Sequence, residues 1–216
     1  PYAVIKGAVL SNSIYGKPFY RLSGDIDILV SRENANKIAE ILAENGFQQG
    51  KVVNEKITPT SRKDILYHRL YTHQMASFQR KTDFLLSPFV AVDVNFDVTW
   101  GEEKKKINVN DFLAHTESTA VYNVNMRKLS PIYEFISMCM HHYKDMNSIY
   151  LLYRNGFRLY EFFDIYYYLI NRSIDPLSLK EVGIQFGVAQ YVYYCIFYTY
   201  KLFPDNRLKV YLNTLF

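Results

Sequence analysis

Two aspartates separated by one residue are the side chains of this chain best suited to chemistry. Asp25 and Asp27 stand in the run Gly24–Ile28, whose apolar neighbours are typical of a β-strand. In a strand, residues i and i+2 face the same way, about 6.6 Å apart at ~3.3 Å per residue. Two like charges held together cost free energy unless a cation neutralises them. Because oxygen ligands favour Mg²⁺ or Mn²⁺, this pair predicts a metal site.

A third carboxylate lies further along the chain, on a segment with alternating apolar residues. Asp93 stands between Val92 and Val94, and Asp97 has the same parity. A third carboxylate can complete a site for two metal ions about 3.5–4 Å apart, which promotes in-line phosphoryl displacement. It can also accept the proton of an attacking hydroxyl. We expect Asp93 to join the aspartate pair, with Asp97 as the alternative third ligand.

A phosphate site is expected where Lys6 and Gly7 end the first strand, just before a helix. Free backbone N–H groups at the N-terminus of a helix are good partners for phosphate oxygens. The aspartate pair follows this turn closely along the chain. One β–α–β unit would then carry both the phosphate site and the metal site.

Hydrophobic periodicity indicates the elements that must position these residues. Strands are expected at Tyr2–Lys6, Ile26–Val30, Phe47–Val53, Ile65–Arg80 and Val90–Val98, with a loop from Asn54 to Lys63. Short helices are expected at Ala8–Tyr15 and after the N-cap residue Ser31. Beyond Leu129 the apolar period changes from 2 to 3.6, which predicts helices at Ile132–Tyr143, Ile149–Ile170, Leu177–Gly187 and Ala189–Phe203.

The change of period predicts an α+β fold in two parts. A small mixed β-sheet domain with flanking helices is expected over residues 1–125, followed by an all-α helical bundle over residues 126–216. With 49% hydrophobic and 21% charged residues, the 216-residue chain has ordinary globular composition, and disorder is excluded. No apolar run reaches about 18 residues, so no transmembrane helix is expected.

Aromatic residues make up 17% of the chain, as 20 Tyr, 15 Phe and one Trp, and most fall in the helical half. Tyr160, Phe163 and Tyr167 are spaced as in a core or interface stripe of a helix. We expect most aromatic residues to pack the core, and the alternative is a base-stacking or ligand-binding surface. Cys139 and Cys195 share these apolar helical patterns and are expected to be buried free thiols. Because no secretory signal pattern is present, a cytoplasmic location is expected.

Three strings of the sequence resemble a known superfamily. Ile5–Leu10 (IKGAVL), Arg21–Val30 (RLSGDIDILV) and Val92–Phe96 (VDVNF) are similar to the nucleotidyltransferase superfamily with the DNA polymerase β-type fold. More narrowly, they resemble a group of uncharacterised nucleotidyltransferases often found near natural-product and peptide-modification genes. Three further features resemble the helical half of that group, namely Leu129–Pro131, His141 with Lys144, and Asp164.

The resemblance implies a role for each matching position. Asp25, Asp27 and Asp93 would be both the metal ligands and the catalytic carboxylates. Gly7 would approach the triphosphate, and Lys6 and Arg21 match basic positions of the group, whose phosphate contact we infer from their charge. Ser11, Gly24 and Lys144 are further candidates for contact with the nucleotide. The superfamily usually has Gly-Ser or Gly-Gly where this chain has Gly7-Ala8, so a hydroxyl that would touch phosphate is missing there, although Ser11 is nearby. Asn95 stands where the narrower group often has histidine.

These observations together predict an enzyme that uses Mg²⁺ or Mn²⁺ and a nucleoside triphosphate, with ATP as the first choice. It would transfer the nucleoside monophosphate to a hydroxyl or similar nucleophile of a small molecule, a peptide or a protein, and release pyrophosphate. The alternative is a catalytically silent module of the same fold that binds a peptide or partner through its Tyr-rich helical half. The Gly7-Ala8 departure motivates that alternative. A net charge of +4 argues against a nucleic-acid acceptor, which would need a dense basic groove.

The histidines are expected to be structural. His68 and His73 are expected at the surface of a strand, although His73 could approach the substrate. His141 and His142 are expected on a helix, with one of them packed inside. Lys144 is expected to be solvated unless it meets the nucleotide from across the domain cleft.

Overall fold

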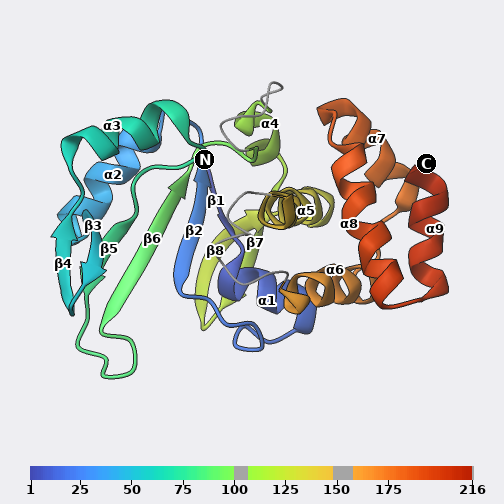
Figure 1. Ribbon diagram of the computed structural model, residues 1–216, viewed down its shortest axis with the longest axis horizontal. Coiled ribbons are helices and arrows are strands. Elements are labelled where there is room, and N and C mark those ends of the chain that lie inside the picture. The colour runs from blue at the N-terminus through green and yellow to red at the C-terminus, as the bar shows by residue number, and fades with distance from the viewer. Residues whose placement is uncertain (100–106, 148–157, 216) are drawn as a thin grey trace.

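The computed structural model describes residues 1–99, 107–147 and 158–215 (Figure 1). An eight-stranded mixed sheet forms one end of the molecule, and the last helices of the chain form the other. The strands are β1 (Tyr2–Ile5), β2 (Asp25–Val30), β3 (Gln48–Val53), β4 (Lys56–Pro59), β5 (Phe78–Lys81), β6 (Phe89–Asn95), β7 (Thr116–Val121) and β8 (Val124–Leu129). Their order across the sheet is β4-β3-β5-β6-β2-β1-β8-β7.

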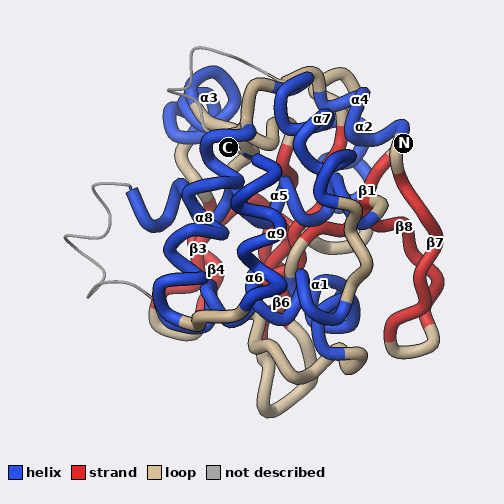
Figure 2. The backbone as a smooth tube through the Cα atoms, turned by 90° about the vertical axis from the view of Figure 1, so that its right-hand side faces the viewer, coloured by secondary structure: helices blue, strands red, loops and turns tan. Residues whose placement is uncertain are grey.

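Nine helices connect or follow these strands within the described residues. They are α1 (Gly7–Tyr15), α2 (Ala35–Glu44), α3 (Arg62–Tyr71), α4 (Val109–Ala114), α5 (Pro131–Asn147), α6 (Leu159–Asn171), α7 (Pro176–Phe186), α8 (Ala189–Leu202) and α9 (Asn206–Leu215). Seen from the helical end, α8 and α9 lie in front of the strands, and the β7–β8 hairpin projects to one side (Figure 2). The predicted fold class, a mixed sheet with flanking helices followed by a helical part, is confirmed.

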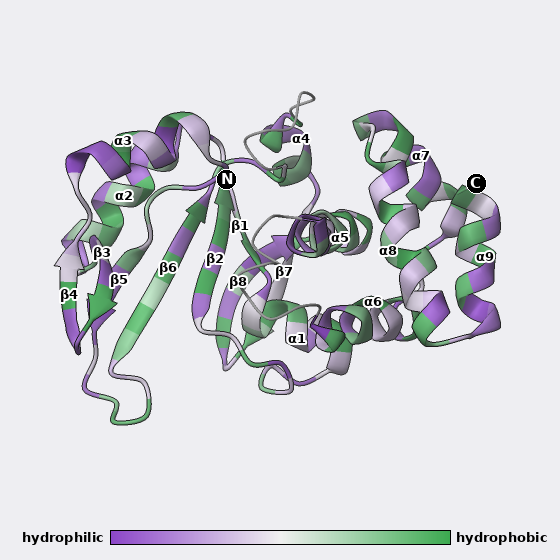
Figure 3. Ribbon diagram, viewed as in Figure 1, coloured by the Kyte–Doolittle hydropathy of each residue, from purple (hydrophilic) through white to green (hydrophobic). Residues whose placement is uncertain are grey.

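The two faces of the central sheet are covered by different helices because β2 alternates. Leu29 points into a large apolar cluster that includes residues of α1, α5, α6 and α8. Val30 points the other way, into a smaller cluster with Val94, against which α2 packs. β2 also changes from hydrophilic at its start to hydrophobic towards its end (Figure 3). The aspartates therefore lie in the first half of β2, where the strand begins outside the core, on the face that looks towards α5.

The large apolar cluster joins both halves of the chain into one core. It contains Ala3 and Ile14 from the first half and Phe135, Ile165 and Ile196 from the second, each at most 1% exposed. The boundary placed between residues 125 and 126 falls inside β8, which pairs with β1 through Val4 and Lys128. The final hairpin of the sheet thus lies on both sides of that boundary, and the helices pack directly on the sheet.

The prediction of a single strand over Ile65–Arg80 is wrong. Helix α3 and the short strand β5 occupy this part of the chain instead. The helix begins at Ser61, whose Oγ accepts a hydrogen bond from the backbone N–H of Asp64 at 3.1 Å. That N-cap satisfies one of the free amides of the first turn. The preceding segment is also not a plain loop, because Asn54 and Glu55 take positive φ angles and turn β3 into β4.

The helical half follows its periodicity with two differences. The helix expected at Ile149–Ile170 begins at Leu159, and the earlier part of that prediction lies outside the described residues. Helix α9 has no counterpart in the sequence prediction. The buried free thiols are confirmed at Cys139 and Cys195. Most large aromatic side chains of these helices pack in or against the core, as expected. The stripe of Tyr160, Phe163 and Tyr167 does not belong to that core, because Tyr160 is 43% exposed and Tyr167 is 39% exposed.

Candidate active site

The three predicted aspartates are brought together by the parallel pairing of β2 with β6. In this register Asp27 lies directly opposite Asp93, and Asp25 lies one pair earlier, opposite Ala91. Residues paired across adjacent strands share a face, and so do residues two apart along one strand. Asp25, Asp27 and Asp93 therefore gather on the face of the sheet that looks towards α5. Asp97 lies beyond the end of β6, where its Oδ1 accepts hydrogen bonds from the N–H and Oγ1 of Thr99.

The electrostatics of this group call for a cation. Partial burial, and then the charges of Asp27 and Asp93, raise the pKa of Asp25 above its usual value. Burial also raises the pKa of Asp93, although the side chain of Ser77 beside it opposes the rise. Like charges held together raise one another's pKa because ionising one disfavours ionising the next.

Asp27 already has a positive partner. Its Oδ1 accepts hydrogen bonds from Lys6 Nζ at 3.0 Å and from Asn95 Nδ2 at 3.1 Å. Asp27 is 5% exposed and Asn95 is 2% exposed, so the amide is part of the buried floor of the site. Asn95, noted in the sequence only as a departure from the family pattern, thus holds the orientation of the central carboxylate.

Lys6 reaches Asp27 from an unusual backbone conformation. Its φ is 61° and that of Gly7 is 52°, so two consecutive residues lie at positive φ where β1 turns into α1. A residue other than glycine pays of order 1–3 kcal/mol there, and such strain clusters at functional sites. Helix α1 has no side-chain N-cap, which leaves its first backbone amides available to an anion. A Cβ at Gly7 would lie 3.2 Å from the Oγ of Ser23, so the glycine also lets the next loop cross closely.

Ser11 is turned inward, away from the open side of this turn. It is fully buried, donates to the carbonyl of Lys17 at 2.7 Å and accepts from the N–H of Arg21 at 3.0 Å. Its hydroxyl therefore anchors the loop between α1 and β2. The same loop carries Gly24, which has open space at its Cβ position and directly precedes Asp25.

The remaining predicted residues approach the aspartates from the helical side. Lys144, on α5, is close enough to feel the charges of Lys6 and Asp27, and burial lowers its pKa. The nearby His141 also has a lowered pKa, caused by burial and then by the positive charges of Lys6 and Lys144. A site with this many cations around three carboxylates suits a ligand that brings both phosphate groups and metal ions.

His73 is not on a strand surface, as was expected, but in the connection between α3 and β5. Burial and the charges of Lys144 and Lys6 lower its pKa to about 3, so it is neutral at physiological pH. Its backbone carbonyl accepts from the N–H of Phe96 at 2.9 Å. His68 lies on α3 rather than on a strand. His142 is 1% exposed, which confirms that one of the adjacent histidines is packed inside.

The comparison with protein families decides the class of this site. The model of a family of uncharacterised nucleotidyltransferases matches residues 1–204. The chain belongs to this family. Membership of this family supports nucleotidyl transfer, in general terms, as the chemistry of the site. No curated protein matches the sequence.

A solved structure shares the fold of this nucleotidyltransferase family member. It is the crystal structure of an antigenic nucleotidyltransferase-like protein from Paracoccidioides brasiliensis, with a TM-score of 0.54 and 13% sequence identity. The match covers 97% of this chain and 84% of that chain, so the fold extends over the sheet and the helices alike. None of the described helices is both long enough and apolar enough to span a membrane.

The donor set can be tested against the metal that nucleotidyl transfer commonly uses. Across the described ranges, no three His, Cys, Asp or Glu side chains are already gathered in a metal-binding arrangement. The chemistry of the donors nevertheless fits a hard divalent cation, because three carboxylates lie on one face of two paired strands and Mg²⁺ prefers oxygen ligands. One of these oxygens, Asp93 Oδ1, is buried without a hydrogen-bond partner within the described part of the chain. A buried carboxylate oxygen without a partner is costly, and a bound cation would relieve that cost.

Glu161, which the sequence analysis did not single out, makes the stability of the helical half depend on pH. It is 3% exposed, and burial followed by the charge of Asp145 raises its pKa from 4.5 to about 7, while Arg158 and Arg21 oppose the rise. An acid whose pKa is raised by folding binds more protons in the folded state. Its contribution to stability is therefore complete below about pH 4.5 and is lost as the pH rises through about 7.

The variant Glu161→Gln should consequently be more stable than the wild type above pH 7, by roughly 1–3 kcal/mol. The difference should vanish near pH 4. Melting temperatures of both proteins across this range check the prediction, with the exposed Glu181→Gln as the control. A gain in stability that does not depend on pH would contradict it.

Proposed function

We propose that this chain is a Mg²⁺-dependent nucleotidyltransferase. It would transfer a nucleoside monophosphate, AMP from ATP as the first choice, to a hydroxyl or similar nucleophile of a small molecule, a peptide or a protein. Pyrophosphate would be the second product. The observation that carries the proposal is the register of β2 with β6, which sets Asp27 opposite Asp93 with Asp25 on the same face.

The carboxylates divide the work in this proposal. Asp25, Asp27 and Asp93 would hold magnesium, which when bound supplies positive charge to the triphosphate. Asp93 would also accept the proton of the attacking hydroxyl, a role that its raised pKa favours. The acceptor oxygen forms a bond to the α-phosphorus while the bond to the bridging oxygen breaks, and pyrophosphate carries away that electron pair.

The basic residues would bind the triphosphate. The free amides at the start of α1, after Gly7, are placed to donate to phosphate oxygens. Lys6, at the turn between β1 and α1, contacts Asp27, and Lys144 on α5 is near enough to feel the charge of the same aspartate. Arg21 approaches from the loop before β2, beside Gly24. Much of the catalysis would be positioning and charge neutralisation, as is general in phosphoryl transfer.

A transfer assay tests the proposal directly. The protein is incubated with each of the four nucleoside triphosphates and Mg²⁺, with a lysate of its own cells as the source of acceptor. Mass spectrometry should then detect a nucleoside monophosphate added to a small molecule, a peptide, a protein or the enzyme itself. Omission of Mg²⁺ should abolish the product.

A thermal-shift titration separates the enzyme from a silent module of the same fold. Millimolar nucleoside triphosphate with Mg²⁺ should raise the melting temperature, because a ligand that binds only the folded state stabilises it. Absence of both a shift and a transferred nucleotide would overturn the proposal and favour the silent module.

A further inference from the structure

Asp164 lies on α6 in the helical half, yet its carboxylate contacts the loop that carries the predicted nucleotide-binding residues. It is 1% exposed. Its Oδ2 accepts a hydrogen bond from Arg21 Nε at 2.8 Å, and its Oδ1 accepts one from the hydroxyl of Tyr15 at 2.8 Å. Both carboxylate oxygens thus have partners from α1 or from the loop that follows it. Hydrogen bonds between ionised groups are short and strong, and burial strengthens them further.

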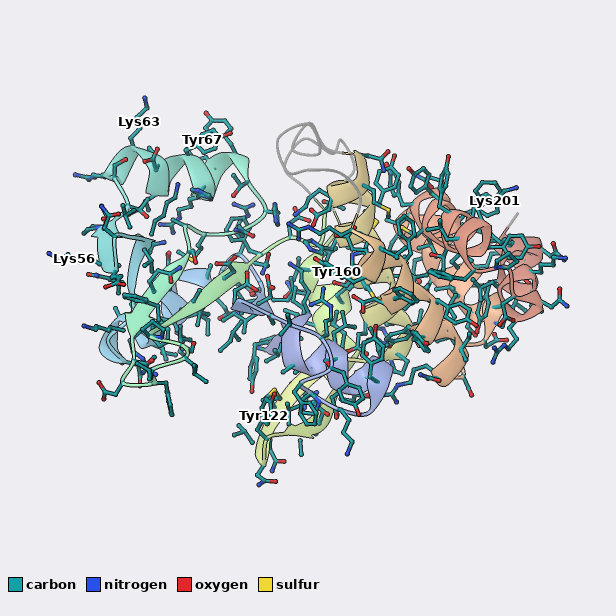
Figure 4. The ribbon with its side chains drawn as sticks, turned by 60° about the horizontal axis from the view of Figure 1, so that its bottom comes forward. Lys56, Lys63, Tyr67, Tyr122, Tyr160 and Lys201 are labelled. Atoms are coloured by element: carbon teal, nitrogen blue, oxygen red, sulfur yellow. The ribbon has the colours of Figure 1, made fainter. Side chains whose placement is uncertain are left out.

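The contact uses only one edge of the Arg21 guanidinium. Its Nε donates this bond, and within the described part of the chain Nη1 and Nη2 have no hydrogen-bond partner, although the side chain is only 12% exposed. Cζ of Arg21 lies 5.5 Å from the centroid of the Tyr160 ring, which also lies on α6. Figure 4 shows Tyr160 near the middle of the molecule, far from Lys63 at one end and Lys201 at the other. A guanidinium fixed at Nε and placed over a ring is oriented to offer its two remaining nitrogens as a fork.

The neighbouring histidine does not compete for this carboxylate. His142 Nε2 is 3.8 Å from Asp164 Oδ2, beyond hydrogen-bond distance. Burial, together with the charges of Arg21 and Lys6, lowers the pKa of His142 to about 3, so the ring is neutral. Arg21 is therefore the cation that balances the buried charge of Asp164. Its Nε lies 2.8 Å from Oδ2 of that carboxylate.

Arg21 lies near the same pair of histidines as Lys6. Its charge and that of Lys6 act together on His141 and on His142, and Lys6 itself contacts Asp27. Two residues after Arg21, Ser23 crosses so close to Gly7 that a Cβ on that residue would lie 3.2 Å from the Ser23 Oγ. The free edge of the guanidinium thus belongs to the same basic rim as Lys6 and the α1 N-terminus.

We propose that Asp164 is a positioning residue, which acts through Arg21 to hold its guanidinium towards the triphosphate of the substrate. The proposal rests on the proposed function, since it assumes a nucleoside triphosphate in the site. It assigns to the helical half an indirect part in nucleotide affinity, exerted through Arg21. Tyr15 supports the same carboxylate from α1 and belongs to the same arrangement.

A double-mutant cycle tests the proposal. Dissociation constants of ATP with Mg²⁺ are measured by calorimetry for the wild type, Asp164→Asn, Arg21→Gln and the double variant. Each single change should weaken binding about tenfold, and the double variant should bind no more weakly than Arg21→Gln alone. In transfer assays the loss should appear in KM with kcat little changed, because the contact is made to the bound substrate and the transition state alike. Tyr15→Phe should show a smaller loss of the same kind.

A matched control removes a purely structural tyrosine hydrogen bond. The hydroxyl of Tyr211 donates to the carbonyl of Ile174 at 2.9 Å in the helical half, away from the site. Tyr211→Phe should lower the melting temperature without changing the dissociation constant.

The outcomes separate the two proposals. If the wild type binds no nucleoside triphosphate, the proposed function fails and this inference fails with it. If the wild type binds but Asp164→Asn binds equally well, or if the two losses add in the double variant, Asp164 is structural and only this inference is overturned.

Discussion

Replacing Asp27 with asparagine is expected to lower nucleotidyl transfer roughly a thousandfold or more, while the protein still folds. Asp27 is the central carboxylate, because it lies opposite Asp93 and two residues from Asp25 on the same strand. Asparagine keeps the size of the side chain but removes the charge that would hold a divalent cation. Transfer of labelled nucleoside monophosphate at saturating Mg²⁺ and triphosphate measures the loss.

The fold should survive because the substitution changes two opposing contributions. It removes the attraction between Lys6 and Asp27, a contact of 3.0 Å. It also removes one of the charges that raise the pKa of Asp25 and Asp93. The melting temperature should therefore change by no more than a few degrees, about the effect of 1 kcal/mol in a domain of this size.

Asp97→Asn is the matched control for this prediction. Asp97 comes from the same segment as Asp93, but its carboxylate contacts Thr99 beyond the end of β6. The control should retain activity within about twofold, since its carboxylate does not face Asp27. Full activity in Asp27→Asn would refute the assignment of Asp27 as a catalytic metal ligand. If Asp97→Asn lost as much activity as Asp27→Asn, Asp97 rather than Asp93 would be the third carboxylate.

The parity of the acidic residues could be predicted from the sequence because strands alternate with a fixed period. Asp25, Asp27 and Asp93 each stand among apolar residues, which place the carboxylates on known faces of two strands. The pairing of those strands could not be derived in the same way. Register depends on contacts between segments far apart in the chain, and the structure supplies it as Asp27 opposite Asp93.

Local patterns failed where a different local feature decided the structure. The run Ile65–Arg80 contains enough apolar residues for a strand, yet the Ser61 N-cap starts a helix whose residues are nowhere fully buried. A capped helix on the surface has little apolar periodicity to reveal it. The positive φ of Lys6 could not be predicted from the sequence either, because only the following glycine suggests an unusual turn.

Contacts between residues far apart in the chain were the least predictable part of the site. Asn95 beside Asp27 and Asp164 beside Arg21 each join residues more than 60 positions apart. No spacing rule connects such residues, since the first contact depends on the pairing of β2 with β6 and the second on the packing of α6 against α1. Resemblance to the family pointed to Asp164 without a role, and its buried contacts with Arg21 and Tyr15 are the basis of the positioning role that we propose.

The second large effect is expected at Glu134, where α5 is tied to the sheet. Its carboxylate accepts hydrogen bonds from Ser13 Oγ at 3.0 Å, Lys128 Nζ at 3.0 Å and the Tyr168 hydroxyl at 2.7 Å. These partners come from α1, β8 and α6, so one buried side chain joins four elements. Lys128 is itself only 3% exposed.

Glu134→Leu should therefore lower the free energy of unfolding by about 3–5 kcal/mol, because it leaves the buried ammonium of Lys128 without its buried partner. Glu117 also contacts Lys128 at 3.0 Å, but its side chain is 43% exposed. Removing that partner in Glu117→Gln should cost at most about 1 kcal/mol. Urea denaturation of the two variants and the wild type, fitted with a common slope, gives both values.

The double variant Lys128→Met with Glu134→Leu distinguishes a lost attraction from an uncompensated charge. Apolar residues of similar volume can replace a buried ion pair at little cost, because the desolvation penalty disappears with the charges. The double variant should thus recover most of the stability lost in Glu134→Leu alone. If it remains as unstable as the single variant, the hydrogen bonds of Glu134 to Ser13 and Tyr168 hold α1 and α6 in place, and the charge of Lys128 is of minor importance.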